Sequence, residues 1–494
     1  MAETASPSVG ASTRSARVIP HGIVWPFILL SSLFLAWAIP NNMTDTMLAA
    51  FKRIMSLSDS RTAWIQIACY FCGYGCFALP GAIFIKKHTY KSGVLLGLGL
   101  FAGGAMLIYP AGLAAGLSMH LCFMLFLVSL VILFAGLSIL ETSTNSYVCA
   151  IGSEVTATQR LNFAQSFNPF GAITGVVVSQ VFVLSKLNVQ TAEQRQTLPQ
   201  EELAAIQRGE LHAVTTTYLI MGLVMAGLFL AIRLTRMPNL QEDDKSLDLK
   251  NTFGRLFRNG NYVWGVIAQF FYVGAQIAVW SYIIRYVLIQ MDLDAVVASL
   301  GDGASPEAII AKLRGLEPVA AAFYNLCEWV GLDALLPRTA EQAGGTYYIM
   351  SLILFVVGRF ACTLVMDFVK PRNLLTALSA IAVACCLITI YSGGFAGIYA
   401  LLMISFCMSL MFPTIYGLGI AGLGEDTKVG GSGMVMAIAG AAVLTQIQGA
   451  VSDGFGSIKV AYWVPAIAFV IVGFYGAVVC RIHEHRQPVA EAGM

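Results

Sequence analysis

One apolar stretch decides the fold class of this chain. Residues 120–150 read HLCFMLFLVSLVILFAGLSILETSTNSYVCA, and the only Asp, Glu, Lys or Arg among them is Glu141. About 20 apolar residues in a helix cross the hydrocarbon core of a bilayer. The stretch therefore predicts a transmembrane helix that carries a single carboxyl group.

Similar stretches recur along the 494 residues, and the composition agrees with them. Hydrophobic residues make up 57% of the chain and charged residues 11%, whereas a soluble domain has about 25% charged residues. This excludes an ordinary soluble enzyme. We predict an all-α integral membrane protein with twelve transmembrane helices of about 20 residues or more. The predicted spans are residues 23–50, 62–86, 92–110, 120–150, 161–184, 213–233, 261–290, 345–368, 373–392, 396–421, 430–451 and 459–481.

A charged segment, Gln241-Glu242-Asp243-Asp244-Lys245, interrupts the apolar pattern near the middle of the chain. It predicts an N-terminal six-helix bundle (1–240), a cytoplasmic linker (241–260) and a C-terminal six-helix bundle (261–494). The C-terminal bundle contains a long insertion at about 291–344, which we expect to be extracytoplasmic and to form one or two helices.

The two predicted bundles resemble each other where their fourth helices end. Span four is followed by Gly152-Ser153-Glu154-Val155-Thr156 and span ten by Gly424-Glu425-Asp426-Thr427, which indicates an internal duplication. Two related bundles around a central site are typical of transporters that work by alternating access. Lys and Arg are more frequent in the segments on the side of the two termini, which predicts that both termini are cytoplasmic.

The composition gives no reason to expect nucleic acid, a metal or a cofactor. The net charge is only +2 at pH 7, which is too small to indicate a nucleic-acid surface. Most of the 11 cysteines lie inside apolar runs and have no metal-ligand spacing to His, so we interpret them as packing residues. No nucleotide-binding or nucleophile motif occurs, and we predict that the chain is not an enzyme.

Two carboxyl groups stand out within the predicted spans, where a charge is costly. Asp45 shares a helix face with Asn42 in span one, and Glu141 lies on a polar face of span four. Removal from water favours the neutral form of a carboxyl group, so each acid could take up a proton. We interpret both as proton-coupling groups. The structural alternatives are a wet or helix-end position for Asp45 and an arginine partner for Glu141.

Amide side chains suit an uncharged, polyhydroxylated ligand, because they donate and accept hydrogen bonds without charge. Asn162, Gln165 and Asn168 repeat every three residues in span five. Interhelical hydrogen bonding is the structural alternative. The predicted substrate-binding residues are Trp37, Asn42, Gln165, Asn168, Gln269, Tyr272, Gln276, Trp280 and Gln446.

Four of these residues form a stripe on span seven, since Gln269, Tyr272, Gln276 and Trp280 follow at helical steps of three and four. Its rings could stack on a sugar and its amides could bind hydroxyl groups. An interfacial anchor is the alternative for Trp280.

Arg359 lies deep enough in span eight to need a partner. We interpret it as a structural charge that links helices, and contact with the ligand is the alternative.

Several stretches resemble one known family. They are Asn41-Asn42-Met43-Thr44-Asp45-Thr46, Phe51-Lys52-Arg53-Ile54-Met55, Phe134-Ala135-Gly136-Leu137-Ser138, Glu141-Thr142-Ser143, Ala164-Gln165-Ser166-Phe167-Asn168-Pro169, Tyr272-Val273-Gly274-Ala275-Gln276 and Phe412-Pro413-Thr414-Ile415. Together they resemble the bacterial L-fucose–proton symporters, over nearly the whole chain and with both halves in order.

The resemblance implies a major facilitator fold and proton-coupled uptake of a monosaccharide, L-fucose or a related hexose, across a bacterial inner membrane. It implies that Asp45 exchanges the proton and that Glu141 couples sugar recognition to protonation. It also implies that Asn42, Gln165 and Asn168 line the cavity. Related carriers take glucose or galactose, sometimes with sodium, so a sodium-coupled or uniport glucose/galactose carrier is the alternative. The expected partners are the sugar, the proton and the lipid bilayer, and a monomer suffices for this architecture.

Overall fold

The computed structural model describes residues 18–19, 22–55, 65, 67–183, 199–238, 249–300, 306–337 and 340–484, and every regular element among them is helical. The elements of the first half of the chain are α1 (Val24–Ile54), η1 (Ile67–Gly75), α3 (Cys76–Lys87), α4 (Tyr90–Leu113), α5 (Met119–Ala150), α6 (Ala157–Gln165), α7 (Asn168–Val178), η4 (Ser179–Val183) and α9 (Gln200–Leu234).

The second half contains more elements. They are α10 (Leu249–Arg258), α11 (Gly260–Met291), α12 (Leu293–Ala298), α13 (Pro306–Leu316), α14 (Pro318–Val330), α15 (Ala340–Val365), α16 (Pro371–Tyr391), α17 (Gly394–Met408), α18 (Met411–Ile420), α19 (Thr427–Met436), α20 (Gly440–Phe455), α21 (Ile458–Ala461), α22 (Trp463–Phe474) and η9 (Tyr475–Val479). Short 3-10 turns join some of these elements, namely η2 (Ala114–Gly116), η3 (Glu154–Thr156), η6 (Asp333–Leu335), η7 (Gly424–Asp426) and η8 (Ala437–Ala439).

Within these described residues, eleven helices are long and apolar enough to cross a membrane. This confirms the predicted all-α membrane architecture. The predicted span at 161–184 is divided into α6, α7 and η4, which follow one another along the chain. Residues 241–248 of the predicted linker lie outside the described residues.

Pro169 explains the division between α6 and α7. Proline has no N–H, so Pro169 cannot donate to the carbonyl oxygen of Gln165 four residues earlier. The chain tightens at this point, where the Ser166 N–H bonds to the Phe163 carbonyl oxygen at 3.1 Å. The helix then resumes as α7, with Pro169 in its first turn, where proline is tolerated. The break leaves the Gln165 carbonyl oxygen free for another donor.

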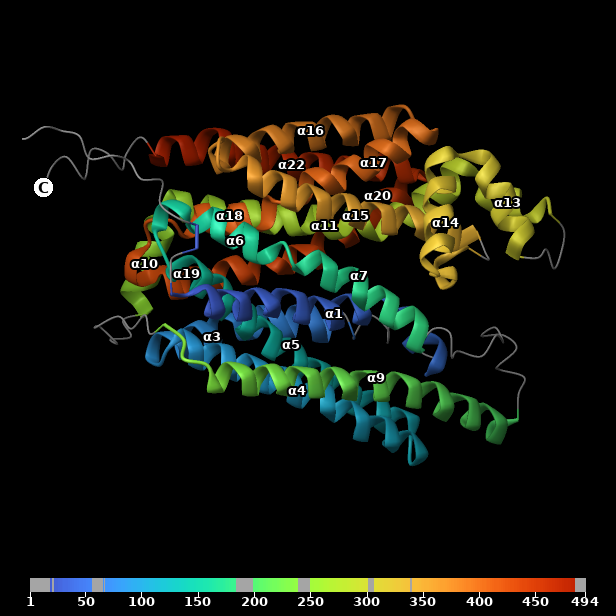
Figure 1. Ribbon diagram of the computed structural model, residues 1–494, viewed down its shortest axis with the longest axis horizontal. Coiled ribbons are helices and arrows are strands. Elements are labelled where there is room, and N and C mark those ends of the chain that lie inside the picture. Colours follow the sequence, from blue (N-terminus) through green and yellow to red (C-terminus); the bar gives the residue numbers. More distant parts are fainter. Residues whose placement is uncertain are drawn as a thin grey trace, which may run out of the picture.

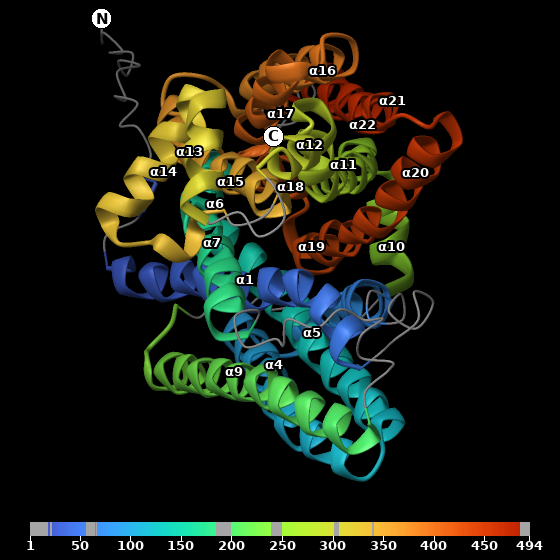
Figure 2. The ribbon, with the colours of Figure 1, turned by 90° about the vertical axis from the view of Figure 1, so that its right-hand side faces the viewer.

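The long helices lie side by side (Figure 1). Most helices of the first half, coloured blue to green, form one group, and most helices of the second half, yellow to red, form the other; the end-on view in Figure 2 shows the same separation. In the first group α4 packs along α5 and α9, and α1 packs along α7. In the second group α11 contacts α15, α20 and α22, while α16 contacts α17 and α22.

The two groups meet most closely at one end of the molecule. There α6 packs on α18, and α19 packs on α3 and α5. Figure 1 places α10, α18 and α19 toward this end, and α13 and α14 at the opposite end. We call these the α10 end and the α14 end.

A buried carboxylate attaches α14 to the neighbouring long helices. Glu317 is 3% exposed and accepts hydrogen bonds from the N–H groups of Val319 (2.9 Å) and Ala320 (2.5 Å) at the start of α14. The hydroxyl groups of Tyr347 in α15 and Tyr399 in α17 also donate to this carboxylate. One side chain therefore caps α14 and joins it to two long helices.

The contact between α4 and α5 depends on glycines, because small residues let transmembrane helices approach closely. A Cβ atom at Gly104 would lie 2.5 Å from the backbone nitrogen of Leu133, and one at Gly97 would lie 2.6 Å from that of Leu140. Gly97 thus faces the residue that precedes Glu141. The backbone of α4 supports α5 directly at the level of its carboxyl group.

We therefore expect Gly104→Ala to push α4 away from α5 and to destabilise the protein by about 1–3 kcal/mol, as overpacking typically does. Gly103→Ala is the matched control, since a Cβ atom there would meet nothing within 4 Å. The melting temperature of the purified protein in detergent measures the difference. Equal melting temperatures for the two variants would contradict this close packing.

Candidate functional site

Glu141 lies within α5 and is 7% exposed. Its polar neighbours are the side chains of Tyr74 in η1 and of Asn145, one turn further along α5. The Ser138 hydroxyl donates to the carbonyl oxygen of Tyr74 at 3.1 Å, which ties η1 to the same face of α5. Tyr74 was not predicted from the sequence. It belongs to a π-helical segment, and such segments occur frequently at functional sites.

A row of polar side chains leads from the neighbourhood of Glu141 to the second half of the chain, and it begins at Asn145. The Gln165 side-chain amide donates to Asn145 Oδ1 at 2.9 Å. Arg359 of α15 then donates through Nη1 to the Gln165 carbonyl oxygen (3.3 Å) and to Gln165 Oε1 (3.4 Å). The carbonyl oxygen is the one that Pro169 leaves without a helical donor. Glu141, Gln165 and Arg359 are predicted separately from the sequence, and the structure brings the three together.

Arg359 is 3% exposed, and its guanidinium carbon lies 4.9 Å from the centre of the Phe355 ring. Among the side chains that the structure describes, no carboxylate lies within ion-pair distance of Arg359, and its buried Nε has no hydrogen-bond partner. Its contacts are therefore an amide, a carbonyl oxygen and an aromatic face. A buried cation held by neutral groups retains capacity for a further acceptor.

A second arginine fixes how α6 sits against α5. Arg160 is fully buried and donates to the carbonyl oxygens of Val148 (2.7 Å) and Cys149 (2.5 Å) near the C-terminal end of α5. It also donates to Thr156 Oγ1 at 3.1 Å. These bonds satisfy carbonyl groups that have no partner inside the helix. They hold Gln165 of α6 beside the polar face of α5.

The predicted stripe on α11 lies near Arg359. Tyr272 is fully buried, donates to the Met408 carbonyl oxygen at 3.0 Å and interacts electrostatically with Arg359. Trp280 Nε1 donates to Ser405 Oγ at 3.2 Å, and its ring lies 5.2 Å from the Phe355 ring that Arg359 covers. Trp280 thus belongs to the same group of side chains as Arg359.

The two glutamines of the stripe differ in their surroundings. Gln269 is fully buried, and neither atom of its amide group has a hydrogen-bond partner among the described residues. Gln276 is half-buried. An unpaired buried amide is costly, about 1–3 kcal/mol, and therefore marks a place where a polar ligand or water would bind favourably.

The predicted residues of α1 and α7 are adjacent to one another. Trp37 is buried against Phe34, with ring centres 4.5 Å apart, and Asn168 donates to the Phe34 carbonyl oxygen at 3.3 Å. Asn42 is half-buried and donates to the Ala38 carbonyl oxygen at 2.8 Å. For Asp45 the structure describes only the backbone, which is helical and belongs to α1.

In α20 the predicted residue Gln446 is exposed, whereas Gln448 is fully buried with neither amide atom paired among the described residues. Both glutamines lie within one apolar stretch, and periodicity did not distinguish which of them faces inward. Gln448 is therefore an additional candidate beside Gln446.

Hydrogen bonds join the two groups of helices toward the α10 end. Ser146 Oγ lies 2.9 Å from the Tyr416 hydroxyl, and the Asn162 amide donates to Thr414 Oγ1 at 3.1 Å. Nearer the surface, the Gly422 N–H donates to Glu154 Oε1 at 2.8 Å. These bonds connect α5, α6 and η3 of the first half with α18 and the segment after it, so the groups are in contact on this side of the polar path.

Known proteins share the sequence and the architecture of this chain. Residues 27–444 match the Major Facilitator Superfamily. The L-fucose-proton symporter of Haemophilus influenzae is 33% identical over 473 residues, which cover 94% of this chain and 98% of that protein. The glucose/galactose transporter of Brucella abortus is 28% identical over 91% of this chain and 92% of its own length.

Solved structures agree with the sequence relatives. Crystal structures of the Escherichia coli fucose:proton symporter FucP, one of them in the outward conformation, match with a TM-score of 0.75 and 35% identity, over 92% of this chain and 98% of theirs. Sequence and fold therefore lead to the same conclusion: this chain belongs to the Major Facilitator Superfamily and, within it, to the family of the L-fucose-proton symporters.

Proposed function

We propose that the chain is a secondary transporter that takes up a monosaccharide, L-fucose or a related hexose, by proton symport across a bacterial inner membrane. One observation carries the proposal: the polar path from the buried Glu141 through Asn145 and Gln165 to the buried Arg359. The names of the relatives support the same substrate and the same coupling ion.

Protonation of Glu141 can be transmitted along this path. An ionised carboxylate only accepts hydrogen bonds, whereas a protonated one also donates. Asn145 Nδ2, one turn from Glu141, has no hydrogen-bond partner among the described residues and can respond to this change, while Asn145 Oδ1 accepts from Gln165. Gln165 offers its side-chain oxygen and its carbonyl oxygen to Arg359. The protonation state in the first half thereby influences a contact with the second half.

We propose that the sugar binds beside this path, with Asp45 as the group that exchanges the proton. The unpaired amide of Gln269 and the ring of Trp280 supply the kinds of contact that a sugar needs: hydrogen-bonding groups and an aromatic face. The proposed ligand-binding set is the predicted one, which comprises Trp37, Asn42, Gln165, Asn168, Gln269, Tyr272, Gln276, Trp280 and Gln446.

The transport cycle that we propose is a rocking of two bundles, residues 1–240 and 261–494, which the cytoplasmic linker 241–260 connects. The α10 end faces the cytoplasm together with both termini, and the insertion at 291–344 faces outward. In this assignment the bonds Ser146–Tyr416 and Asn162–Thr414 close the cytoplasmic side, and the conformation is outward-facing. A monomer is sufficient for the cycle.

The second candidate function is a sodium-coupled or uniport glucose/galactose carrier. The glucose/galactose transporter of Brucella abortus, which aligns with 91% of this chain, is the observation that favours it.

Glu141→Gln removes the ionisable group and retains its shape. We expect wild-type proteoliposomes to concentrate labelled L-fucose by up to about tenfold per pH unit for one-proton symport, since one pH unit equals 1.36 kcal/mol. The variant should show no accumulation but should still exchange labelled for unlabelled sugar. The control is Glu328→Gln, which changes an exposed glutamate of α14. Accumulation by Glu141→Gln at the wild-type level would contradict the coupling role.

Arg359→Gln removes the charged donor to Gln165. Because a hydrogen bond to a charged group contributes about 1.5–3 kcal/mol, we expect sugar exchange to slow by roughly 10- to 100-fold. Arg359→Lys should restore only part of the rate, because ammonium lacks the planar fork of guanidinium. Arg285→Gln in α11 is the control. If Arg359→Gln exchanged sugar at the rate of this control, the contact between Arg359 and Gln165 would not contribute to transport.

The two candidate functions separate in one exchange experiment with a panel of labelled hexoses and deoxyhexoses, at two pH values, with and without sodium. Proton symport of L-fucose or a related hexose predicts uptake that an external acid pH increases and that sodium does not change. Uptake of glucose or galactose that follows sodium, or that ignores both ions, would instead select the second candidate.

A further inference from the structure

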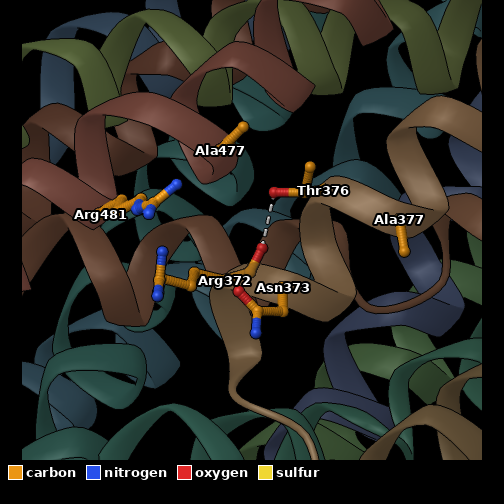
Figure 3. A pocket seen from close by; sticks show the side chains of 6 residues that line it. All are labelled: Arg372, Asn373, Thr376, Ala377, Ala477 and Arg481. Atoms are coloured by element: carbon orange, nitrogen blue, oxygen red, sulfur yellow. Dashed lines mark hydrogen bonds between the residues drawn. The ribbon is translucent and has the colours of Figure 1, made fainter.

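A basic pocket lies in the second half of the chain, between the start of α16 and the end of the helical stretch Ile458–Glu484, which includes α21, α22 and η9. It has a volume of about 580 Å³. Its lining consists of Arg372, Asn373, Thr376, Ala377, Ala477 and Arg481. Figure 3 shows Arg372 and Arg481 approaching one another from the two elements, with Asn373 and Thr376 on the α16 side.

The pocket carries more positive charge than its own carboxylate can balance. Glu484 Oε2 lies 2.9 Å from Arg372 Nε and 3.5 Å from Lys370 Nζ. The Arg372 Nε atom is buried and has no hydrogen bond of good geometry. Within the described part of the chain, Arg481 has no ion pair. Lys370 and Arg372 thus share one carboxylate and Arg481 adds a third cation, so these four side chains carry a formal charge of +2.

Small residues open the space in front of these cations. Ala377 and Ala477 line the walls, and next to them Gly476 allows a close approach of the two elements. A Cβ atom at Gly476 would lie 2.7 Å from Thr376 Oγ1. The Thr376 hydroxyl itself donates to the Arg372 carbonyl oxygen at 2.8 Å, which fixes the first turn of α16 (Figure 3). The pocket is therefore shaped by the packed backbone as well as by its side chains.

Apolar side chains close to the pocket residues along the chain are exposed. They are Phe368 before α16 and Phe474, Val478 and Ile482 within the helical stretch Ile458–Glu484. Phe368 is 90% exposed. Figure 1 places the start of α16 and the end of the last helix toward the α10 end. A ligand that fits would present an anionic group to the arginines and apolar chains to these side chains.

We propose that this pocket binds the phosphate group of an anionic phospholipid headgroup in the leaflet at the α10 end. Guanidinium groups bind phosphate oxygens in a bidentate manner, and basic pockets between transmembrane helices are a known form of anionic headgroup site. Arg372 and Arg481 bind the phosphate, and Asn373 supplies an uncharged donor. Glu484 orients Arg372 through its ion pair with Nε.

The test uses the purified full-length protein in neutral detergent, with phosphatidylglycerol or phosphatidylcholine added at equal mole fraction. Native mass spectrometry counts retained lipids, and thermal unfolding reports stabilisation. We expect phosphatidylglycerol to be retained preferentially and to raise the melting temperature, and added salt to weaken this effect. Retention of both lipids to the same extent would overturn the proposal.

Variants locate the binding. The double variant Arg372→Gln with Arg481→Gln should retain about tenfold less phosphatidylglycerol, as expected when charge-assisted contacts to phosphate are lost. The matched control, Arg233→Gln with Arg236→Gln near the end of α9, removes the same charge and should retain the lipid. If the double variant does not fold, Arg481→Gln alone serves, because Arg481 is exposed. Unchanged retention by Arg481→Gln would then overturn the assignment.

Inorganic phosphate distinguishes a lipid from a free anion. We expect phosphate at the same concentration as the lipid to leave the melting temperature unchanged, because it lacks the apolar chains. Equal stabilisation by inorganic phosphate would indicate a free-anion site and would overturn the lipid assignment. These measurements contain no sugar, so their outcome is independent of the proposed transport.

Discussion

The carbonyl oxygen of Gln165 has no donor within its own helix, and Arg359 supplies one from the other half of the chain. Inside a bilayer, water is scarce, so a free backbone carbonyl must find its partner within the protein. Pro169 creates this requirement and Arg359 satisfies it at 3.3 Å. The same guanidinium group also reaches the side chain of Gln165, and through it the path to Glu141. The break between α6 and α7 thus exposes a carbonyl oxygen that a residue of α15 can bind.

The position of Glu141 depends on support from several directions. Gly97 and Gly104 let α4 approach the backbone of α5 closely, and Arg160 holds α6 to the end of α5. Because interiors are close-packed, a movement of α6 relative to α5 cannot be absorbed locally. The carboxyl group is therefore held by packing within its own half, whereas the row of polar side chains that leads from it to Arg359 consists of hydrogen bonds that can exchange partners.

Two of the contacts toward the α10 end have the same character. Ser146–Tyr416 and Asn162–Thr414 are single hydrogen bonds between neutral groups, each contributing only about 0.5–1.5 kcal/mol. Such bonds can close one side of a transporter and still open during a cycle. They lie on α5 and α6, the same helices that carry Glu141 and Gln165, so the polar side chains and these contacts between the halves involve the same elements.

Much of this protein follows from its sequence alone, because the bilayer imposes a simple rule: long apolar helices with few charges must span it. That rule predicted the all-α membrane architecture, and it singled out Glu141 and Arg359 as charges that needed an explanation. The resemblance to the L-fucose–proton symporters predicted the family. Local periodicity also placed Gln269 and Tyr272 on one face of a helix.

Only the tertiary structure joined these residues. Gln165 and Arg359 are 194 positions apart, and no local pattern encodes a contact between such distant helices. The rotation of α20 buries Gln448 and exposes Gln446, a choice that depends on neighbouring helices, since both glutamines fit the same apolar stretch. Tyr74 reaches Glu141 from a π-helical segment whose register the sequence does not reveal. Packing between helices, which is non-local, decided all three.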